Sequence, residues 1–126
     1  VLEVEGKVRL PFIHPYASNN GHMFYMVCQS IEQRQALIGH LKSKGIHAVF
    51  HYLSLHKSPF YQEKHDGRIL ENCDMYADRL VRLPAFYELA LEDIEEICAE
   101  VIAFFQQSQP VNGHQKVTLP SSQTES

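Results

Sequence analysis

The stretch Ser30-Ile-Glu-Gln-Arg-Gln-Ala-Leu-Ile-Gly-His-Leu-Lys-Ser-Lys-Gly45 contains the clearest structural signals of this 126-residue chain. Ser30 and Gln33 have the spacing of a capping box, in which the serine hydroxyl accepts a hydrogen bond from the Gln33 amide and the glutamine side chain reaches back. Apolar residues then recur at helical spacing, lysines fill the last turn, and Gly45 is suited to a left-handed exit. These signals predict a helix over residues 31–44.

β-Strands are predicted on both sides of this helix. Residues 22–29, His-Met-Phe-Tyr-Met-Val-Cys-Gln, form a short run rich in aromatic and β-favouring side chains after a turn signal. Residues 46–52, Ile-His-Ala-Val-Phe-His-Tyr, alternate apolar residues with His47 and His51, which predicts a second strand. A strand, a helix and a strand joined by short connections suggest a local crossover unit.

The rest of the chain is predicted to form a long loop and two further helices. Residues 53–68 lack periodicity and are too long for a simple connection, which is typical of functional loops. An apolar helical face runs from about Asn72 to Val81 and stops before Pro84, because proline disfavours helix in the residue before it. A last helix closes near Gln107. The apolar residues that define the two faces are Cys73, Tyr76, Ala77, Leu80 and Val81 in the first and Ile94, Ile97, Cys98, Val101 and Phe105 in the second.

Length and composition predict one small α+β domain. A chain of 14.5 kDa that is 44% hydrophobic can bury an ordinary core, but not two. Residues 1–21 are predicted to be an extended lead-in and residues 22–107 the folded domain. Residues 108–126 are rich in Ser, Gln, Thr, Pro and Gly, which predicts a disordered tail.

Charge and cysteine usage exclude several classes of protein. Eleven basic and fifteen acidic residues give a net charge of -4 without a basic stripe, which argues against nucleic-acid binding. No run of about 18 apolar residues could span a bilayer, so we expect no membrane insertion. Cys28, Cys73 and Cys98 lie far apart inside apolar patterns and are predicted to be buried in a reducing compartment. We therefore expect a cytoplasmic protein.

The most suggestive polar cluster is His51, Tyr52 and His56, where a predicted strand runs into the long loop. Open α/β sheets place ligands at strand ends, so these side chains could bind a polar small molecule or a phosphate group. The alternative is that His51 and Tyr52 cap a strand and that His56 is solvated.

Other chemistry finds less support in the sequence. A metal site could be built from His51, His56, His65 and Cys73, but only the first two histidines have a zinc-like spacing. The cysteines are interpreted as packing residues, and only Lys57, beside His56, is conceivable as a Schiff-base lysine. We therefore assign no catalytic, cofactor-binding or metal-binding residue to this chain.

Four sequence blocks in a fixed order are informative about family. They are Asn20-Gly-His-Met-Phe-Tyr25, Arg34-x-Ala-Leu-Ile-x-x-Leu-Lys42, Ile46-x-Ala-Val-Phe-His-Tyr-x-x-Leu-His-x-x-Pro59 and Arg79-Leu-x-Arg-Leu-Pro-x-Phe-Tyr87. Together they cover most of residues 19–106. They resemble the C-terminal domain of sugar-nucleotide aminotransferases of the DegT/DnrJ/StrS family.

The resemblance implies a pyridoxal-phosphate (PLP) enzyme of the aspartate-aminotransferase fold, fold type I, of which this chain is the small C-terminal domain with a short sheet and about three helices. Such an enzyme moves an amino group from glutamate to a keto carbon of a nucleotide-linked deoxysugar such as a dTDP-sugar. It implies a role in cell-envelope polysaccharide or lipopolysaccharide biosynthesis. The family's catalytic lysine, its pyridinium-binding aspartate and its phosphate cup belong to a large N-terminal domain that nothing here matches. We therefore expect the isolated chain to bind no PLP and to be catalytically incomplete.

The resemblance also implies where substrate is bound. The loop after the second strand approaches the cofactor and the sugar nucleotide, which here means His51, Tyr52 and His56, and His22 is an additional candidate. Ser54 stands where the block often has a proline, which leaves the loop less stiff.

Two further expectations concern assembly and an alternative function. Family members form homodimers, mostly through the large domain, and a small domain on its own would expose apolar surface that favours self-association. The alternative function is a stand-alone α+β binding module whose histidine-rich loop holds a small ligand or a metal.

Overall fold

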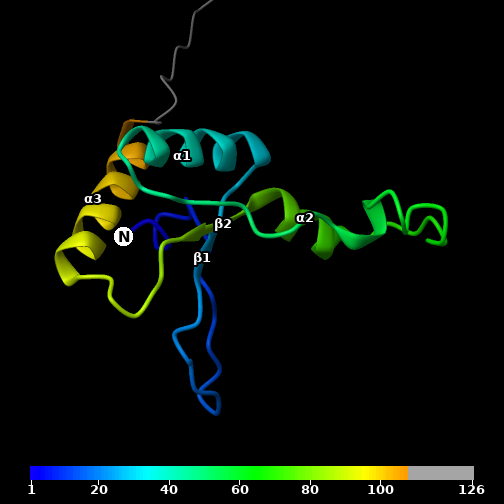
Figure 1. Cartoon of the computed structure of the whole chain (residues 1–126), viewed down its shortest axis with the longest axis horizontal. Coiled ribbons are helices and arrows are strands. Elements are labelled where there is room, and N and C mark those ends of the chain that lie inside the picture. Colours follow the sequence, from blue (N-terminus) through cyan, green and yellow to red (C-terminus); the bar gives the residue numbers. More distant parts are fainter. Residues whose placement is uncertain (108–126) are drawn as a thin grey trace, which may run out of the picture.

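The computed structural model describes residues 1–107, in which three α-helices lie around a two-stranded antiparallel sheet (Figure 1). The elements are β1 (Phe24–Val27), α1 (Ile31–Ser43), α2 (Glu71–Arg79), β2 (Leu80–Leu83) and α3 (Leu91–Gln107), with a short 3-10 turn at Leu55–Lys57. The predicted α+β class with a short sheet and about three helices is confirmed. The predicted disordered tail lies outside the described residues.

Helix α1 forms for the local reasons that its sequence contains. The Ser30 hydroxyl accepts a hydrogen bond from the Gln33 amide at 3.2 Å. The Gln33 side chain does reach back, but its oxygen accepts from the amide of Gln29, one residue before the cap, at 2.8 Å. Gly45 follows the helix with a φ of 77°, a left-handed conformation that costs glycine little. The predicted helix and its punctuation are therefore confirmed.

The partner of β1 is not the segment that the sequence favoured. β1 pairs antiparallel with β2, Phe24 opposite Leu83 and Val27 opposite Leu80. The prediction that Leu80 and Val81 continue a helix is wrong, because α2 ends at Arg79 and both side chains are buried in the sheet. The helical spacing linked Leu80 and Val81 to residues of α2, none of which is buried. For Leu80 and Val81, burial in the sheet outweighs that spacing.

Residues 46–52 do not form the predicted second strand. They touch the sheet through a single bridge, in which the amide and carbonyl of Val49 bond to Arg82 at 3.1 and 2.7 Å. The alternation that suggested a strand is real, since Ile46 and Ala48 are buried and His47 is exposed. The segment therefore runs beside β2, on the edge away from β1, without a continuous ladder.

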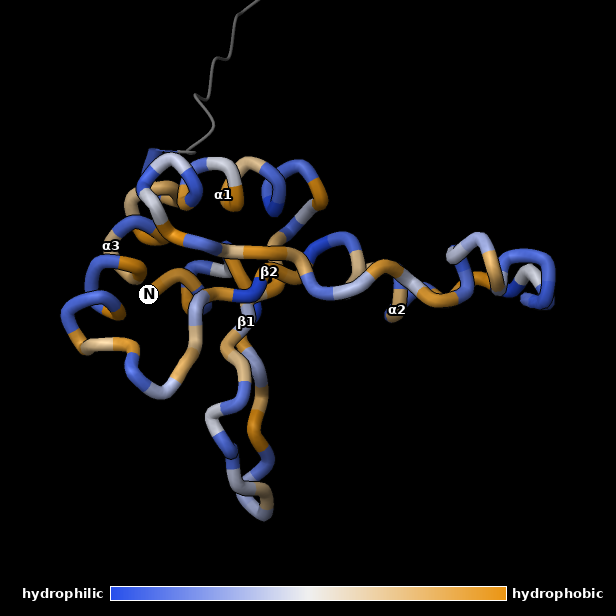
Figure 2. The backbone as a smooth tube through the Cα atoms, in the orientation of Figure 1, coloured by the Kyte–Doolittle hydropathy of each residue, from blue (hydrophilic) through white to orange (hydrophobic). Residues whose placement is uncertain are grey.

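The core lies between α1, α3 and the sheet. Leu37, Leu41 and Val81 are its most completely buried side chains. Val8, from the predicted lead-in, also joins this core, and the bridge between Arg9 and Val27 places the lead-in against β1. Figure 2 shows hydrophobic residues gathered along these central segments and a hydrophilic far end of the loop that precedes α2. Within residues 1–107, no helix is long and apolar enough to cross a bilayer.

Only one of the three cysteines is buried as predicted. Cys28 lies in the core, whereas Cys73 and Cys98 are exposed. Cys73 is exposed because α2 buries no residue, and Cys98 is exposed because α3 turns Ile97, Val101 and Phe105 toward the core instead. The prediction that both are packing residues is therefore wrong.

Arg34 joins α1 to the segments on either side of the long loop. Its side chain is buried, and Nη1 donates a hydrogen bond to the Ala77 carbonyl near the end of α2 at 2.9 Å. Its guanidinium also lies 5.5 Å from the centre of the Phe50 ring, a cation–π distance. The loop between residues 50 and 77 is thus anchored at both ends to one side chain of α1.

Candidate functional site

A cavity of about 420 Å³ lies between residues 55–70 and the start of α2. Its wall combines apolar side chains with the histidines His56 and His65 and the cations Lys64 and Arg68. The loop that forms it projects to one side of the molecule, away from α3 (Figure 1). The long, aromatic and histidine-rich loop of the sequence is therefore the part of the chain that builds this hollow.

Asp74 lies behind the cavity wall and holds His56, one of the residues that line it. Its Oδ1 accepts a hydrogen bond from the Ser54 hydroxyl at 3.1 Å and lies 2.9 Å from Lys57 Nζ and 3.1 Å from His56 Nε2. The Lys57 hydrogen bond is the main cause that holds the pKa of Asp74 below its usual value of 3.8, with the Ser54 bond acting in the same direction. A single carboxylate thus fixes three groups from one turn of the loop.

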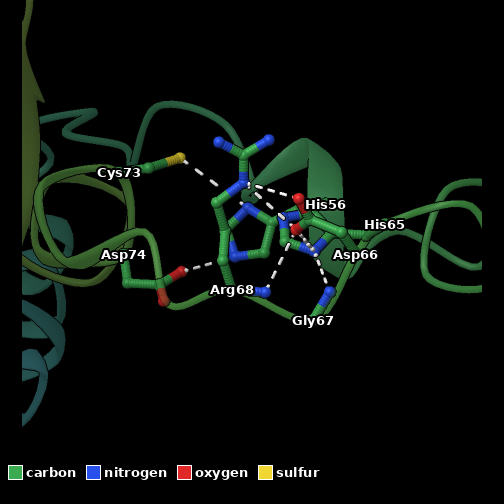
Figure 3. Close-up of polar contacts among 7 residues, drawn as sticks. All are labelled: His56, His65, Asp66, Gly67, Arg68, Cys73 and Asp74. Carbon is green, nitrogen blue, oxygen red and sulfur yellow. Dashed lines mark hydrogen bonds and ion pairs between the residues drawn. The ribbon is translucent and has the colours of Figure 1, made fainter.

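His56 is held from two directions (Figure 3). Its side chain is only 13% exposed, with Nε2 toward Asp74 and Nδ1 4.0 Å from the sulfur of Cys73. The ring centre of His65 lies 5.0 Å away, and His65 Nδ1 accepts from the Gly67 amide at 2.9 Å. The imidazole is therefore oriented by a carboxylate on one side and faces a thiol on the other.

The other charged pair of the wall is local to the loop. Arg68 Nε lies 2.9 Å from an oxygen of Asp66. The backbone and side-chain hydrogen bonds from Arg68 lower the pKa of Asp66. Lys64 Nζ instead lies 3.8 Å from the centre of the Phe60 ring. Cationic groups therefore surround the cavity without all being matched by carboxylates.

The remaining residues proposed from the sequence do not line this cavity. His51 is partly buried with Nδ1 buried and unbonded, and its ring centre lies 4.3 Å from that of Tyr52, which is 72% exposed. His22 is exposed, and its amide donates to Asn20 Oδ1 at 3.1 Å. Of the four proposed residues, the structure places His56 alone in the cavity wall. The substrate-binding roles of all four remain predictions.

Sequence reasoning missed Asp74 and misjudged Cys73. Ser54 and Lys57 flank His56, but the carboxylate that they share lies twenty positions after Ser54. Nothing in the loop sequence indicates that pairing, because it depends on α2 folding back against the loop. The only available signal for Asp74 was its position beside Glu71, as one of two acidic residues in the first turn of a helix that follows a long loop.

A metal is not supported by the geometry. In the described part of the chain, no group of three or more His, Cys, Asp or Glu side chains could hold a metal ion. His51 does not join His56 and His65 at the cavity, so the set considered from the sequence does not assemble.

The lysines within residues 1–107 do not fit the amine of a PLP enzyme. Such an amine must lose its proton near neutral pH. The hydrogen bond that Lys57 donates to Asp74 raises the pKa of Lys57, which works against that requirement. Lys42, Lys44 and Lys64 are exposed, and Lys7 is paired with Glu5. The residues described here therefore do not fit the cofactor on their own.

Comparison with known proteins places the chain in a family. The sequence model of the DegT/DnrJ/EryC1/StrS aminotransferase family matches residues 2–102. Among solved structures, the aminotransferase TlmJ from Streptoalloteichus hindustanus is 22% identical with a TM-score of 0.71 over 80% of this chain and 27% of its own. NtdA from Bacillus subtilis, solved with bound PMP, is 20% identical with a TM-score of 0.72 over 84% of this chain and 25% of its own.

DesV from S. venezuelae, solved in complex with a ketimine intermediate, is 25% identical with a TM-score of 0.67 over 78% of this chain and 26% of its own. The chain thus spans about a quarter of the length of these solved relatives. The family match covers well over half of the chain and agrees with the structural likeness. The chain belongs to the DegT/DnrJ/EryC1/StrS aminotransferase family.

Proposed function

We propose that this chain is the C-terminal small domain of a PLP-dependent aminotransferase that transfers an amino group from glutamate to a nucleotide-linked 4-keto-6-deoxysugar. Its family and its coverage of about a quarter of each relative support this proposal. The four sequence blocks together resemble dTDP-4-amino-4,6-dideoxygalactose transaminases, and in this proposal the substrate is of the kind that those enzymes use. The product would then serve cell-envelope polysaccharide or lipopolysaccharide synthesis.

The observation that carries the substrate assignment is the cavity beside His56. Lys64 and Arg68 give its wall cationic donors suited to phosphate oxygens, and Leu55 and Leu70 supply apolar surface for a base or a deoxysugar. His51 and Tyr52 lie earlier on the same loop and would extend the contact beyond the cavity. In this proposal Nδ1 of His56 accepts a hydrogen bond from the substrate, with the ring in a position fixed by Asp74.

Catalysis requires groups that this chain does not provide. PLP supplies the electron sink for transamination, and a protein amine must hold it. Since Lys57 is bound to Asp74 and has a raised pKa, we assign cofactor attachment to the rest of a longer protein. The described part of the chain supplies one wall of the cleft and no step of the chemistry.

Turnover assays test whether the chain on its own is catalytically incomplete. The chain is incubated with PLP, glutamate and a dTDP-4-keto-6-deoxysugar, and amino sugar is measured by mass spectrometry. We expect no product and no stoichiometric pyridoxyl-lysine after borohydride reduction. Turnover, or specific attachment at one lysine, contradicts the proposal.

Calorimetry tests the binding role separately. We expect dTDP-sugar to bind the chain, and His56→Gln to weaken this affinity by about tenfold, the loss of one hydrogen bond of ordinary strength. His47→Gln is the matched control, because His47 is exposed and does not line the cavity. Equal affinities for both variants would remove His56 from the substrate site.

A stand-alone binding module is the second candidate, since residues of this chain form the cavity in the histidine-rich loop without help from a further domain. It differs from the first in its ligand and in needing no further domain. Elemental analysis of protein purified without an affinity tag separates the two. Stoichiometric zinc would favour the module.

A further inference from the structure

Cys73, His56 and Asp74 form a thiol–imidazole–carboxylate series, of which Cys73 and His56 line the cavity (Figure 3). Sγ of Cys73 lies 4.0 Å from His56 Nδ1, and Nε2 of the same ring lies 3.1 Å from Asp74 Oδ1. With Nε2 protonated and bonded to the carboxylate, Nδ1 is free to accept the thiol proton. This is the order of groups that activates cysteine nucleophiles.

The position of Cys73 adds to this activation. It is the third residue of α2 (Glu71–Arg79), within the first turn, where the positive end of the helix dipole favours a thiolate. It is exposed and lines the cavity, so a reagent can reach it. The charged groups around the pair are Lys57 and Asp74 on one side and His65, Asp66 and Arg68 on the other.

The other two cysteines lack this combination. Cys28 is buried, and desolvation raises its pKa to about 11. Cys98 is exposed on α3, but it lines an apolar groove with Phe24 and Phe86, and no hydrogen bond among the described residues joins it to a histidine. The chain therefore contains one exposed thiol with a base and one exposed thiol without a base.

We propose that Cys73 is a site of thiol–disulfide exchange that takes small disulfides bearing carboxylates. The choice of an anionic reagent follows from the charges of the same wall, where Lys64 and Arg68 stand against the single carboxylate of Asp66. His56 takes the thiol proton, and the Cys73 sulfur attacks one sulfur of the reagent. A new S–S bond forms as the old one breaks, and the released thiolate takes the proton from His56. Cys73 then carries a mixed disulfide that fills the cavity, and an excess of free thiol reverses the step.

The experiment measures modification of each cysteine of the 126-residue chain by oxidised glutathione, using mass spectrometry of digests over a range of pH. We expect Cys73 to react about tenfold faster than Cys98. His56→Gln should reduce the Cys73 rate to that of Cys98, while the Cys98 rate stays unchanged. Asp74→Asn should give an intermediate rate, because it removes only the carboxylate that orients the ring.

Two controls are built into the design. Cys28 reports folding, because its modification in a variant indicates loss of the core. If His56→Gln exposes Cys28, the comparison of Cys73 with Cys98 in the unaltered chain still decides the proposal.

Cystamine, a cationic disulfide, should react more slowly than oxidised glutathione at Cys73. Equal rates at Cys73 and Cys98, an unchanged Cys73 rate in a folded His56→Gln variant, or faster reaction with cystamine overturns the proposal.

Discussion

Asp74 shows how one side chain can organise a loop. Its Oδ1 contacts Ser54, His56 and Lys57, so the loop turn before the cavity depends on one charge. Because the pKa of Asp74 is lowered in the folded chain, its contribution to stability is present above its unfolded pKa. That contribution is lost as the pH falls through the lower, folded value.

We therefore expect Asp74→Asn to be less stable than the unaltered chain at about pH 6, with a difference that shrinks as the pH falls toward about 2. The measurement is the urea midpoint of both proteins across this range. Asp78→Asn is the control on the same helix, because Asp78 is exposed and, among the described residues, acts on Lys57 only through a longer-range attraction that is weaker than the Asp74 hydrogen bond. A difference between Asp74→Asn and the unaltered chain that does not change with pH would mean that the carboxylate charge is not responsible.

At this scale the sequence predicted individual site residues only in part. His56 could be proposed as a site residue because it stands in a distinctive local block. The structure places it in the cavity wall, and its role in binding substrate stays a prediction. Asp74 could not, since its partners are separated from it by the whole loop. Cys73 was misread because helical spacing alone does not tell which face of a helix meets the core.

Helix α1 is the element whose ends are best defined by its own residues. The Ser30 hydroxyl satisfies the Gln33 amide, which would otherwise lack a partner at the first turn. We expect Ser30→Ala to lower the free energy of unfolding by about 1 kcal/mol and Ser30→Asp to retain most of it, as measured by urea denaturation.

Ser43→Ala serves as the control for this prediction. The Ser43 hydroxyl bonds only to the carbonyl of His40 in its own helix, and alanine is the better helix former. Its free energy of unfolding should stay within about 0.5 kcal/mol of the unaltered chain. An equal loss in both variants would show that the cap hydrogen bond has no special role.

The contrast between elements explains what a sequence can reveal. α1, β1 and α3 were predicted because capping residues and apolar spacing act within a few residues. β2 was missed because Leu80–Leu83 becomes a strand only through its pairing with Phe24–Val27, more than fifty residues earlier. Residues 46–52 alternate like a strand, yet Val49 alone reaches a partner. Non-local pairing decided each of these cases.

For the whole molecule, the exposed apolar surface next to α3 has consequences for assembly. A groove of about 370 Å³ lies between the end of β2 and α3, with Phe24, Phe86 and Ile94 in its wall at 43%, 62% and 40% exposure. Contiguous apolar surface of this kind favours association. We expect the molar mass from light scattering to rise with the concentration of the chain.

Phe86→Asp should abolish this rise, because it places a charge in the groove, whereas Val4→Asp should leave it unchanged. Val4 is equally accessible, at 91% exposure, but does not line the groove. A strict monomer at high concentration of the unaltered chain would contradict self-association, and a rise that persists in Phe86→Asp would assign it to another surface.

The arm formed by the loop and α2 gives the core little of its packing. Of residues 53–79, Ser54 is the only buried one, and the hydrogen bond from Arg34 ends on a backbone carbonyl that any residue at position 77 would supply. If the arm binds ligand as proposed, ligand contacts and the folded core lie in separate parts of the chain. Under the proposed function, an arm of different length or charge grafted onto the same core would therefore change the ligand specificity.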